Sequence, residues 1–429
     1  MRKLSKRHLL GTITLIGMLS IFVTVPVQAG GLGTYNFATP DVGLAGAGSA
    51  ARAQDAGTIA TNPAGMMLLG NHEMLYGGQM IYGNVNFTPG WGSTAGGNDG
   101  GQAIGWVPGG SFFYVETASP RVKYGIGMYS NFGSMLDYDN NWVGRYYIQE
   151  GALLGMSLTP AIAYRADEHF SIGVAANLMY GMLKSQVAVN NVLDGLGDGQ
   201  LKIKDSTWGV GGNIGLMYEF NPKTRMGLTY NSQVKLNFSD TNEWSNLGPG
   251  IQTILANRGL LNSKTHVDLT VPQQVMVSYY HEINPKWSIM GNIGWQNWSK
   301  FGYAGISIDS NNPTSLVKNM NYNDTWHGAI GAQYRLDPKW ILSCGISYDT
   351  SAVDDVNRTV TVPIGEVWQL GLGATHILNP STSVNFAYSF GWMGDMPVNQ
   401  SRGPLAGTVQ GSYKNANYSV FSVSMSKKF

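Results

Sequence analysis

Short turn signals recur along most of the chain, at intervals of about 40 to 65 residues. Most of them pair Asn or Asp with Pro, which favours a tight turn because Pro fixes φ and the Asx side chain bonds nearby backbone. Each interval holds two strand-like runs separated by a longer, polar, glycine-rich stretch. Six such turns, with both chain ends on their side, give seven up-and-down strand pairs. The turns are Ser119-Pro120, Asp167-Glu168, Asn221-Pro222-Lys223, Asn284-Pro285-Lys286, Asp337-Pro338-Lys339 and Asn379-Pro380-Ser381.

The runs beside these turns alternate with a period of two. Residues 326–334, 340–349 and 383–392 each place large apolar side chains on one face and small or polar ones on the other. About ten alternating residues per run is the pattern of a strand with lipid on one side and a lumen on the other. The sequence therefore predicts an all-β fold, a 14-stranded antiparallel transmembrane β-barrel. A large soluble β-sandwich or propeller is the alternative, but it would show fewer aromatic residues at membrane-interface positions.

Composition narrows the class of protein further. Charged residues make up 12% of the chain, about half the usual share, and mean hydropathy is −0.10. These values exclude a polytopic helical membrane protein and fit a soluble enzyme poorly. Without the four basic residues of the first 29, the chain has 23 basic and 26 acidic residues, which is not the balance of a nucleic-acid-binding protein. The single cysteine, Cys344, falls on the lipid-facing parity, where it serves as a small hydrophobe.

The N-terminal part of the chain divides into two segments ahead of the barrel. Residues 1–29 have a basic start, an apolar stretch and a small-residue cleavage site, which predict a signal peptide, with an uncleaved anchor as the alternative. Residues 30–72 do not alternate and contain nine Gly and nine Ala. We expect this segment to be a plug inside the lumen, because fourteen strands enclose more space than side chains alone fill; a periplasmic linker is the alternative. Residues 73–429 form the predicted barrel.

These features together resemble the FadL family of outer-membrane transporters, which includes long-chain fatty-acid transporters and the TodX-like proteins for aromatic hydrocarbons. The resemblance is carried by the signal peptide, the small-residue segment ending in Asn62-Pro63-Ala64, the fourteen strands and the terminal Phe429. Further local similarities are residues 130–133, 142–147 and 357–363. A terminal aromatic on an alternating strand suits delivery to the barrel-assembly machinery.

The resemblance implies a mechanism and several site residues. The N-terminal segment would be a hatch, and a ligand would leave sideways through a gap beside a kink in the third strand. Leu32 would reach the inner ligand site, while Asn62, Pro63 and Ala64 would pack the hatch against the lateral opening. The kink would lie at Asn131, Phe132 and Gly133, for which the start of an extracellular loop is the alternative.

Two long extracellular loops are expected at residues 134–150 and 239–268. The second loop contains apolar residues with helical spacing, which predicts a short helix with an exposed apolar face. This face would be a first landing site for an apolar ligand, or it would pack onto the other loop. The residues are Ile251, Ile254, Leu255, Leu260 and Leu261.

A ligand carboxylate would need a basic partner, and three residues are candidates. Arg145 lies in the first long loop, where an exposed ion pair is the alternative. Lys184 follows a strand, and its parity with Tyr180 points outward unless a bulge intervenes. His327 has luminal parity, where a hydrogen-bonded structural histidine is the alternative. Neutral hydrocarbons therefore remain open as ligands.

The sequence thus predicts passive uptake of long-chain fatty acids or similar hydrophobic molecules across a bacterial outer membrane. Monoaromatic hydrocarbons are the alternative ligands, and a general porin or an adhesin barrel is the alternative kind of protein. An enzyme is not expected, because no Ser–His pair, metal cluster or nucleotide motif stands out. We expect no cofactor, no metal and no nucleic acid. The expected surroundings are outer-membrane lipid and lipopolysaccharide, with the chain as a monomer.

Overall fold

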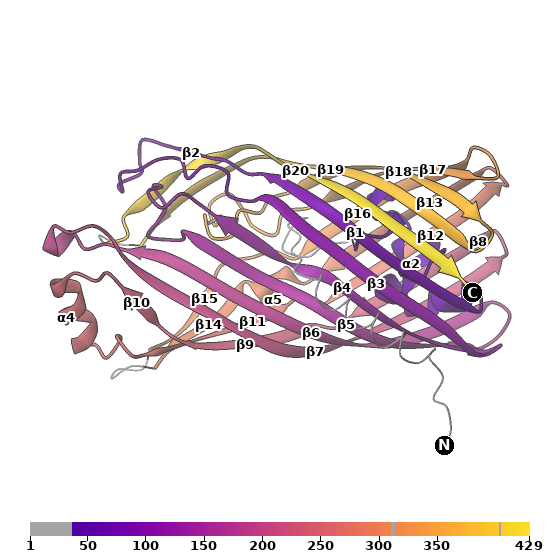
Figure 1. The fold of residues 1–429 in the computed structure, drawn as a ribbon, viewed down its shortest axis with the longest axis horizontal. Helices are drawn as coiled ribbons and strands as arrows, with labels where there is room; N and C mark the ends of the chain where they lie inside the picture. Colours follow the sequence, from indigo (N-terminus) through magenta and orange to yellow (C-terminus); the bar gives the residue numbers. More distant parts are fainter. Residues whose placement is uncertain (1–36, 310–313, 403–404) are drawn as a thin grey trace, which may run out of the picture.

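The computed structural model describes residues 37–309, 314–402 and 405–429. The predicted signal peptide and Leu32 lie outside the described residues. Fourteen antiparallel strands form a closed wall, in which β1 pairs with β20, as the sequence predicts (Figure 1). They are β1 (His72–Asn84), β3 (Gly105–Ser119), β4 (Val122–Asp137), β5 (Glu150–Arg165), β6 (Phe170–Val189), β7 (Gly199–Asn221), β8 (Thr224–Asn231), β12 (Gln274–Asn284), β13 (Trp287–Gln296), β16 (Thr325–Arg335), β17 (Trp340–Asp349), β18 (Val367–Asn379), β19 (Thr382–Ser401) and β20 (Thr408–Lys428).

All six predicted turns join neighbouring strands, and they lie at the end of the barrel where the C-terminus is found (Figure 1). The Asx residues form the expected local bonds. Asn284 Oδ1 accepts from the backbone amides of Lys286 and Trp287 at 2.9 and 3.1 Å, and Asp337 Oδ1 accepts from Lys339 and Trp340 at 2.7 and 2.8 Å. Each bond satisfies a turn amide that has no strand partner, which explains why short Asx turns recur at this end.

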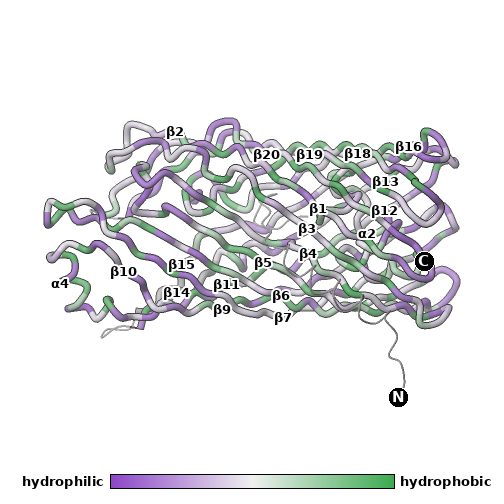
Figure 2. Tube along the Cα trace, in the orientation of Figure 1, coloured by the Kyte–Doolittle hydropathy of each residue, from purple (hydrophilic) through white to green (hydrophobic). Residues whose placement is uncertain are grey.

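The predicted faces of the strands are confirmed. Trp326 is 55% exposed on the outer surface, whereas the next residue, His327, is buried in the lumen. Cys344 is exposed on the outer face, as its parity predicts. Hydropathy alternates along many of the strands in Figure 2. No helix of the described residues is long and apolar enough to cross a membrane.

The far end of the barrel is extended by a second, four-stranded sheet, which the sequence did not predict. Its strands are β9 (Val234–Thr241), β11 (Lys264–Val271), β14 (Tyr303–Ile308) and β15 (Thr314–Asn319). Three short elements lie between these strands in the sequence: β10 (Glu243–Ser245) pairs with β7, α4 (Pro249–Asn257) contacts the short helix that follows β6, and α5 (Trp298–Phe301) contacts β11 and β14. The short strand β2 (Phe87–Pro89) extends the main sheet beside β20, and the 3-10 helix η3 (Val192–Asp194) follows β6.

The two long loops contain fewer irregular residues than the sequence predicts, because strands extend into both of them. β4 continues to Asp137 and β5 starts at Glu150, so the first loop is residues 138–149. The second stretch, 239–268, contains the ends of β9 and β11 as well as β10 and α4. Strand pairing beyond the bilayer explains both differences, because alternation is a weak signal where neither face meets lipid.

Residues 37–70, which we call the luminal segment, lie inside the barrel. The segment contains η1 (Pro40–Leu44), α2 (Ser49–Arg52), α3 (Thr58–Thr61) and η2 (Pro63–Leu68), and nearly all of its residues are buried. η1 contacts β16 to β20, α2 contacts β8, β12 and β13, and η2 contacts β4 to β7. A segment that contacts opposite sides of a closed wall must lie in its lumen, where Figure 1 draws α2.

Inward-facing glycines of the wall let the luminal segment approach the strands closely. A Cβ on Gly345 would overlap the carbonyl oxygen of Leu44, and a Cβ on Gly227 would overlap that of Ala50. Glycine in a strand interior often marks such a close approach of another backbone. The high glycine content of the chain is therefore used in part to seat this segment.

Replacing Gly227 with Ala should loosen the luminal segment but leave the barrel closed. Overlap of this kind costs about 1–3 kcal/mol. In a Cys344→Ser background carrying Ala56→Cys, which is buried in the luminal segment, maleimide labelling should speed up about 10-fold, equivalent to ~1.4 kcal/mol. The matched control is Gly212→Ala, whose Cβ would meet nothing nearer than 3.5 Å. Equal labelling of the two variants would contradict the seating role of Gly227.

Candidate functional site

Hydrogen-bonded pairing between β3 and β4 stops part-way across the wall. The last pair is Ser111 with Tyr129, although β4 goes on pairing with β5 as far as Asp137. The start of β3, from Gly105 to Gly110, pairs only with β1. This stretch contains Pro108, which has no N–H to donate and is therefore suited to an unpaired edge. Tyr129 is the eighth residue of β4, so the pairing stops within the ~10 residues that a strand needs to cross the bilayer.

A β-bulge in β4 lies next to this interruption. The register with β5 shifts between Ser130 and Phe132, so Asn131 is the extra residue. Gly133 follows with a φ of +156°, and a Cβ there would lie 2.7 Å from the carbonyl oxygen of Leu153. β4 is the third strand of the wall and runs on to Asp137, so the bulge lies within a strand; its role at a lateral opening stays a prediction.

An internal cavity of about 50 Å³ lies between the bulge and the luminal segment. Asn131 and Phe132 both line it, because the bulge breaks the strict alternation of β4. The remaining lining residues are Phe37, Ala60, Tyr129, Asn177, Met179, Asn231, Ser232, Val234, Val271, Pro272, Gln274, Gln296 and Trp298.

Aromatic rings close this cavity on two sides. Phe132 stacks on Trp298 with ring centroids 6.4 Å apart, and it meets Phe301 edge-on at 5.9 Å. The ring centroid of Tyr129 lies 5.1 Å from that of Phe37, the first described residue of the luminal segment. A cavity of roughly 150 Å³ is needed to hold benzene. A ligand of that size therefore needs one of these rings to move.

The triplet Asn62-Pro63-Ala64 holds one part of the luminal segment to the wall. Asn62 Nδ2 donates to the carbonyl oxygens of Ala50 at 2.7 Å and Leu216 at 3.0 Å, and its Oδ1 accepts from the Ala64 amide at 3.1 Å. The triplet packs on inward glycines of β6 and β7, Gly173 and Gly215. The triplet thus ties the luminal segment to β6 and β7, and its role at a lateral opening stays a prediction.

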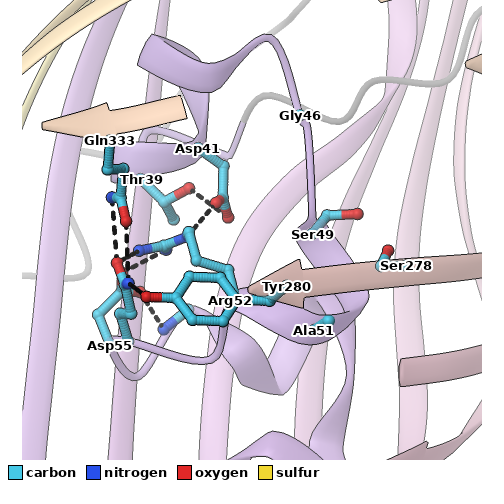
Figure 3. Close-up of polar contacts among 12 residues, drawn as sticks. Thr39, Asp41, Gly46, Ser49, Ala51, Arg52, Asp55, Ser278, Tyr280 and Gln333 are labelled. Atoms are coloured by element: carbon cyan, nitrogen blue, oxygen red, sulfur yellow. Dashed lines mark hydrogen bonds and ion pairs between the residues drawn. The ribbon is translucent and has the colours of Figure 1, made fainter. Parts of the chain in front are cut away.

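A buried ion triad holds the other part of the luminal segment together (Figure 3). Arg52 Nε and Nη2 lie 2.5 Å from Asp41 Oδ1 and Asp55 Oδ2, and all three side chains are at most 5% exposed. Burial alone would lower the pKa of Arg52, but the two carboxylates raise it overall. Burial raises the pKa of Asp41 above its ordinary value.

Three wall side chains continue this polar network. Gln54 Nε2 donates to Gln333 Oε1 at 2.9 Å and to the Tyr280 hydroxyl at 3.3 Å. The Arg225 guanidinium lies 3.9 Å from the ring centroid of Tyr280. Arg225 also donates to the carbonyl oxygen of Ala51 at 2.6 Å. The luminal segment is therefore held to β8, β12 and β16 by directional bonds, which give it one defined position.

The predicted apolar helix of the outer loops is confirmed as α4, at the end of the barrel opposite the turns (Figure 1). Ile254 is 38% exposed, Leu255, Leu260 and Leu261 are half-buried, and Ile251 is buried. α4 contacts η3, where Asp194 accepts from the Gly250 amide at 2.9 Å. The helix packs in part on another loop and keeps part of its apolar face exposed.

Each of the three candidate partners for a carboxylate is already paired with an acidic residue. Arg145 Nε lies 2.6 Å from Asp198 in the outer loops, where burial and then the bond to Asp198 raise the pKa of the neighbouring Tyr146. Lys184 lies within β6 and pairs with Glu150. His327 is buried, with Nδ1 2.9 Å from Asp349 Oδ1, so it is the structural luminal histidine. A ligand carboxylate would have to displace an acidic side chain from any of them.

Two further polar residues lie in the lumen and at its outer end and were not among the predicted site residues. Arg358 is 5% exposed and donates to the carbonyl oxygens of Ile364 at 2.8 Å and Pro397 at 3.1 Å. Asn177 lines the cavity from β6. Its inward parity was readable from the strand, but its position opposite the β4 bulge depends on pairing that no local pattern encodes.

The comparisons with known proteins place the chain in a family. A family model described as "Outer membrane protein transport protein (OMPP1/FadL/TodX)" matches residues 20–429. The chain belongs to this family. It is therefore an outer-membrane transporter for hydrophobic compounds. Relatives include a long-chain fatty acid transport protein of Escherichia coli O6:H1, 26% identical over 86% of this chain and 88% of its own, and outer membrane protein P1 of Haemophilus influenzae, 27% identical over 82% and 83%.

Solved structures of the family have the same fold. A Pseudomonas aeruginosa FadL homologue covers 93% of this chain and 100% of its own, with a TM-score of 0.83 and 19% identity. The P. putida toluene transporter TodX covers 93% and 99%, with a TM-score of 0.66 and 16% identity.

Replacing Arg52 with Gln should release the luminal segment of this FadL/TodX-family protein. The change leaves two carboxylates buried without a cation, which costs about 3–5 kcal/mol. Labelling of an Ala47→Cys reporter in the Cys344→Ser background should rise at least 10-fold, whereas Arg121→Gln in an exposed turn should leave it unchanged.

The triple change Arg52→Met, Asp41→Asn and Asp55→Asn removes all the charges together and should restore slow labelling. Fast labelling in the triple variant, or slow labelling in Arg52→Gln, would show that charge pairing does not hold the segment.

Proposed function

We propose that this protein takes up long-chain fatty acids or similar hydrophobic molecules passively, and releases them sideways into the outer membrane. The observation that carries the proposal is the coincidence of three features in one place. The β3–β4 pairing ends at Ser111 and Tyr129, the bulge at Asn131 follows, and the inner cavity lies directly behind it.

A lateral route suits an apolar ligand for a physical reason. Moving a buried CH₂ group into water costs about 0.8 kcal/mol, so a chain of many such groups should pass from protein to bilayer without meeting water. The unpaired seam lies at membrane depth and needs no aqueous exit. Downhill movement from loops to lumen to lipid requires no energy source.

The luminal segment would act as the hatch. Phe37 and Ala60 line the cavity from this segment, and Leu32 precedes Phe37 by five residues in the sequence. Asn62, Pro63 and Ala64 would serve as its hinge-side anchor on β6 and β7, where their bonds hold it. A shift of the cavity-facing part would enlarge the cavity toward the seam while this anchor stays in place.

The outer loops would capture the ligand first. Ile251, Ile254, Leu255, Leu260 and Leu261 are the proposed contacts, supported by the partly exposed apolar face of α4. Relatives named for long-chain fatty acid transport support a long-chain ligand, and solved toluene transporters of the same fold keep monoaromatic hydrocarbons as the second candidate. We propose a monomeric, non-enzymatic channel that is inserted by the barrel-assembly machinery among outer-membrane lipid and lipopolysaccharide.

Uptake of labelled oleate in cells that lack their own fatty-acid transporter tests this function. We expect expression of the protein to restore uptake. No uptake, with the protein folded in the outer membrane, would refute the fatty-acid ligand, and the same cells would then be tested with labelled toluene.

Deleting Asn131 tests the lateral route. The deletion removes the extra residue of the bulge and should let β4 run straight, so we expect uptake to fall at least 10-fold with the barrel still closed. The control is deletion of Gly197, an outer-loop glycine with no neighbour within 4 Å of its added Cβ. Undiminished uptake after deletion of Asn131 would contradict the lateral route.

A further inference from the structure

The polar groups that line the inner cavity are all neutral. Its described lining has amides and hydroxyls but no charged side chain. The amides are Asn131, Asn177, Asn231, Gln274 and Gln296. The basic residues considered for a carboxylate, Arg145, Lys184 and His327, do not line it. An ionised group entering this cavity would therefore lose water without gaining an opposite charge, which is the most costly kind of burial.

One of these amides has an unsatisfied acceptor. Asn177 Oδ1 is buried and has no hydrogen-bond partner among the described residues. Asn177 has the luminal parity of β6, between the buried Ala175 and Met179. Buried acceptors of this kind are rare in native proteins and call for a donor. A ligand with an O–H or N–H group can bring the donor that Asn177 Oδ1 lacks.

Apolar side chains line the rest of the cavity. Four of the lining residues, Phe132, Met179, Val234 and Trp298, belong to a buried apolar cluster. A volume of about 50 Å³ suits a small head group rather than a whole chain. The cavity thus offers polar partners for a head group, and the buried apolar side chains beside it would have to part around a tail.

We propose that the inner cavity selects a neutral amphiphile whose head group carries an O–H donor, as in a long-chain primary alcohol, and that the hydroxyl donates to Asn177 Oδ1. The inference rests on the proposed transport function and names the head-group chemistry of its ligand. An ionised carboxylate has no proton to donate and would place its charge against an acceptor oxygen. A plain hydrocarbon would leave Asn177 unsatisfied. Asn131 supplies a second contact, because its Oδ1 accepts from Ser157 at 3.1 Å and its amide donor remains for the ligand oxygen.

Saturable binding to the full-length protein in lipid nanodiscs tests the proposal, with empty nanodiscs as background. The probes are labelled 1-dodecanol and labelled dodecanoate at pH 8, where the acid is ionised. We expect the wild type to bind dodecanol at least 10-fold more tightly. Equal or tighter binding of dodecanoate, or no saturable binding of dodecanol, would overturn the inference.

Three variants assign the effect to the side chain. Asn177→Leu should weaken dodecanol binding about 10-fold and leave dodecanoate unchanged, whereas Asn177→Asp keeps the acceptor and should retain dodecanol binding. Asn399→Leu, at an exposed position of β19, is the control. Each variant is first checked for a closed barrel by its heat-dependent shift on a denaturing gel, and Asn177→Ala replaces the Leu variant if that one does not fold.

Unchanged dodecanol binding in Asn177→Leu would overturn the role of this residue. Failure of the inference can be told apart from failure of the proposed function, because the latter is judged by uptake of labelled oleate or toluene in cells that express the unaltered protein. Tight dodecanoate binding together with restored oleate uptake would keep the transport function and reject only the neutral head group.

Discussion

The requirement that backbone polar groups be paired inside a bilayer governs the whole structure. Lipid offers no hydrogen bonds, so strands can span the membrane only as a closed barrel, and here the β1–β20 pair completes the closure. An interruption of pairing at membrane depth is costly under this rule. The separation of β3 and β4 beyond Ser111 and Tyr129 is therefore informative. Pro108 has no N–H to leave unpaired in this stretch of β3, and the bulge at Asn131 follows the last β3–β4 pair.

Closing a barrel of fourteen strands creates an interior that must then be filled. The luminal segment does so with small residues that press against inward glycines such as Gly227 and Gly345. Close packing of small residues does not by itself fix the conformation of the segment. The ion pairs among Asp41, Arg52 and Asp55 do so, because their hydrogen bonds require a defined geometry. A polar interior at this level is compatible with an apolar ligand, since the cavity lies on the other side of the segment, beside β4 and β6.

The sequence predicted what local patterns encode. The short turn signals located six hairpins, and period-two alternation assigned residues such as Trp326 and His327 to the correct faces. It could not locate contacts between distant segments. Asn62-Pro63-Ala64 packs on β6 and β7 because of glycines more than a hundred residues away. The second sheet of β9, β11, β14 and β15 was not predicted either. Its strands belong to the part of the chain assigned to outer loops, where neither face has to be apolar and alternation is weak.

The distribution of charge links the fold to the ligand. Arg145, Lys184 and His327 are each neutralised by an acidic side chain, and the cavity behind the seam has no charged lining residue. An ionised carboxylate would find no free positive charge along the described part of this pathway, whereas a neutral ligand would meet amides and aromatic rings. Because the cavity is about 50 Å³, entry of a ligand as large as benzene would require the rings around it to move. Phe37 belongs to the luminal segment and Phe132 to the bulge, so in the proposed mechanism one displacement would act on both the cavity and the seam.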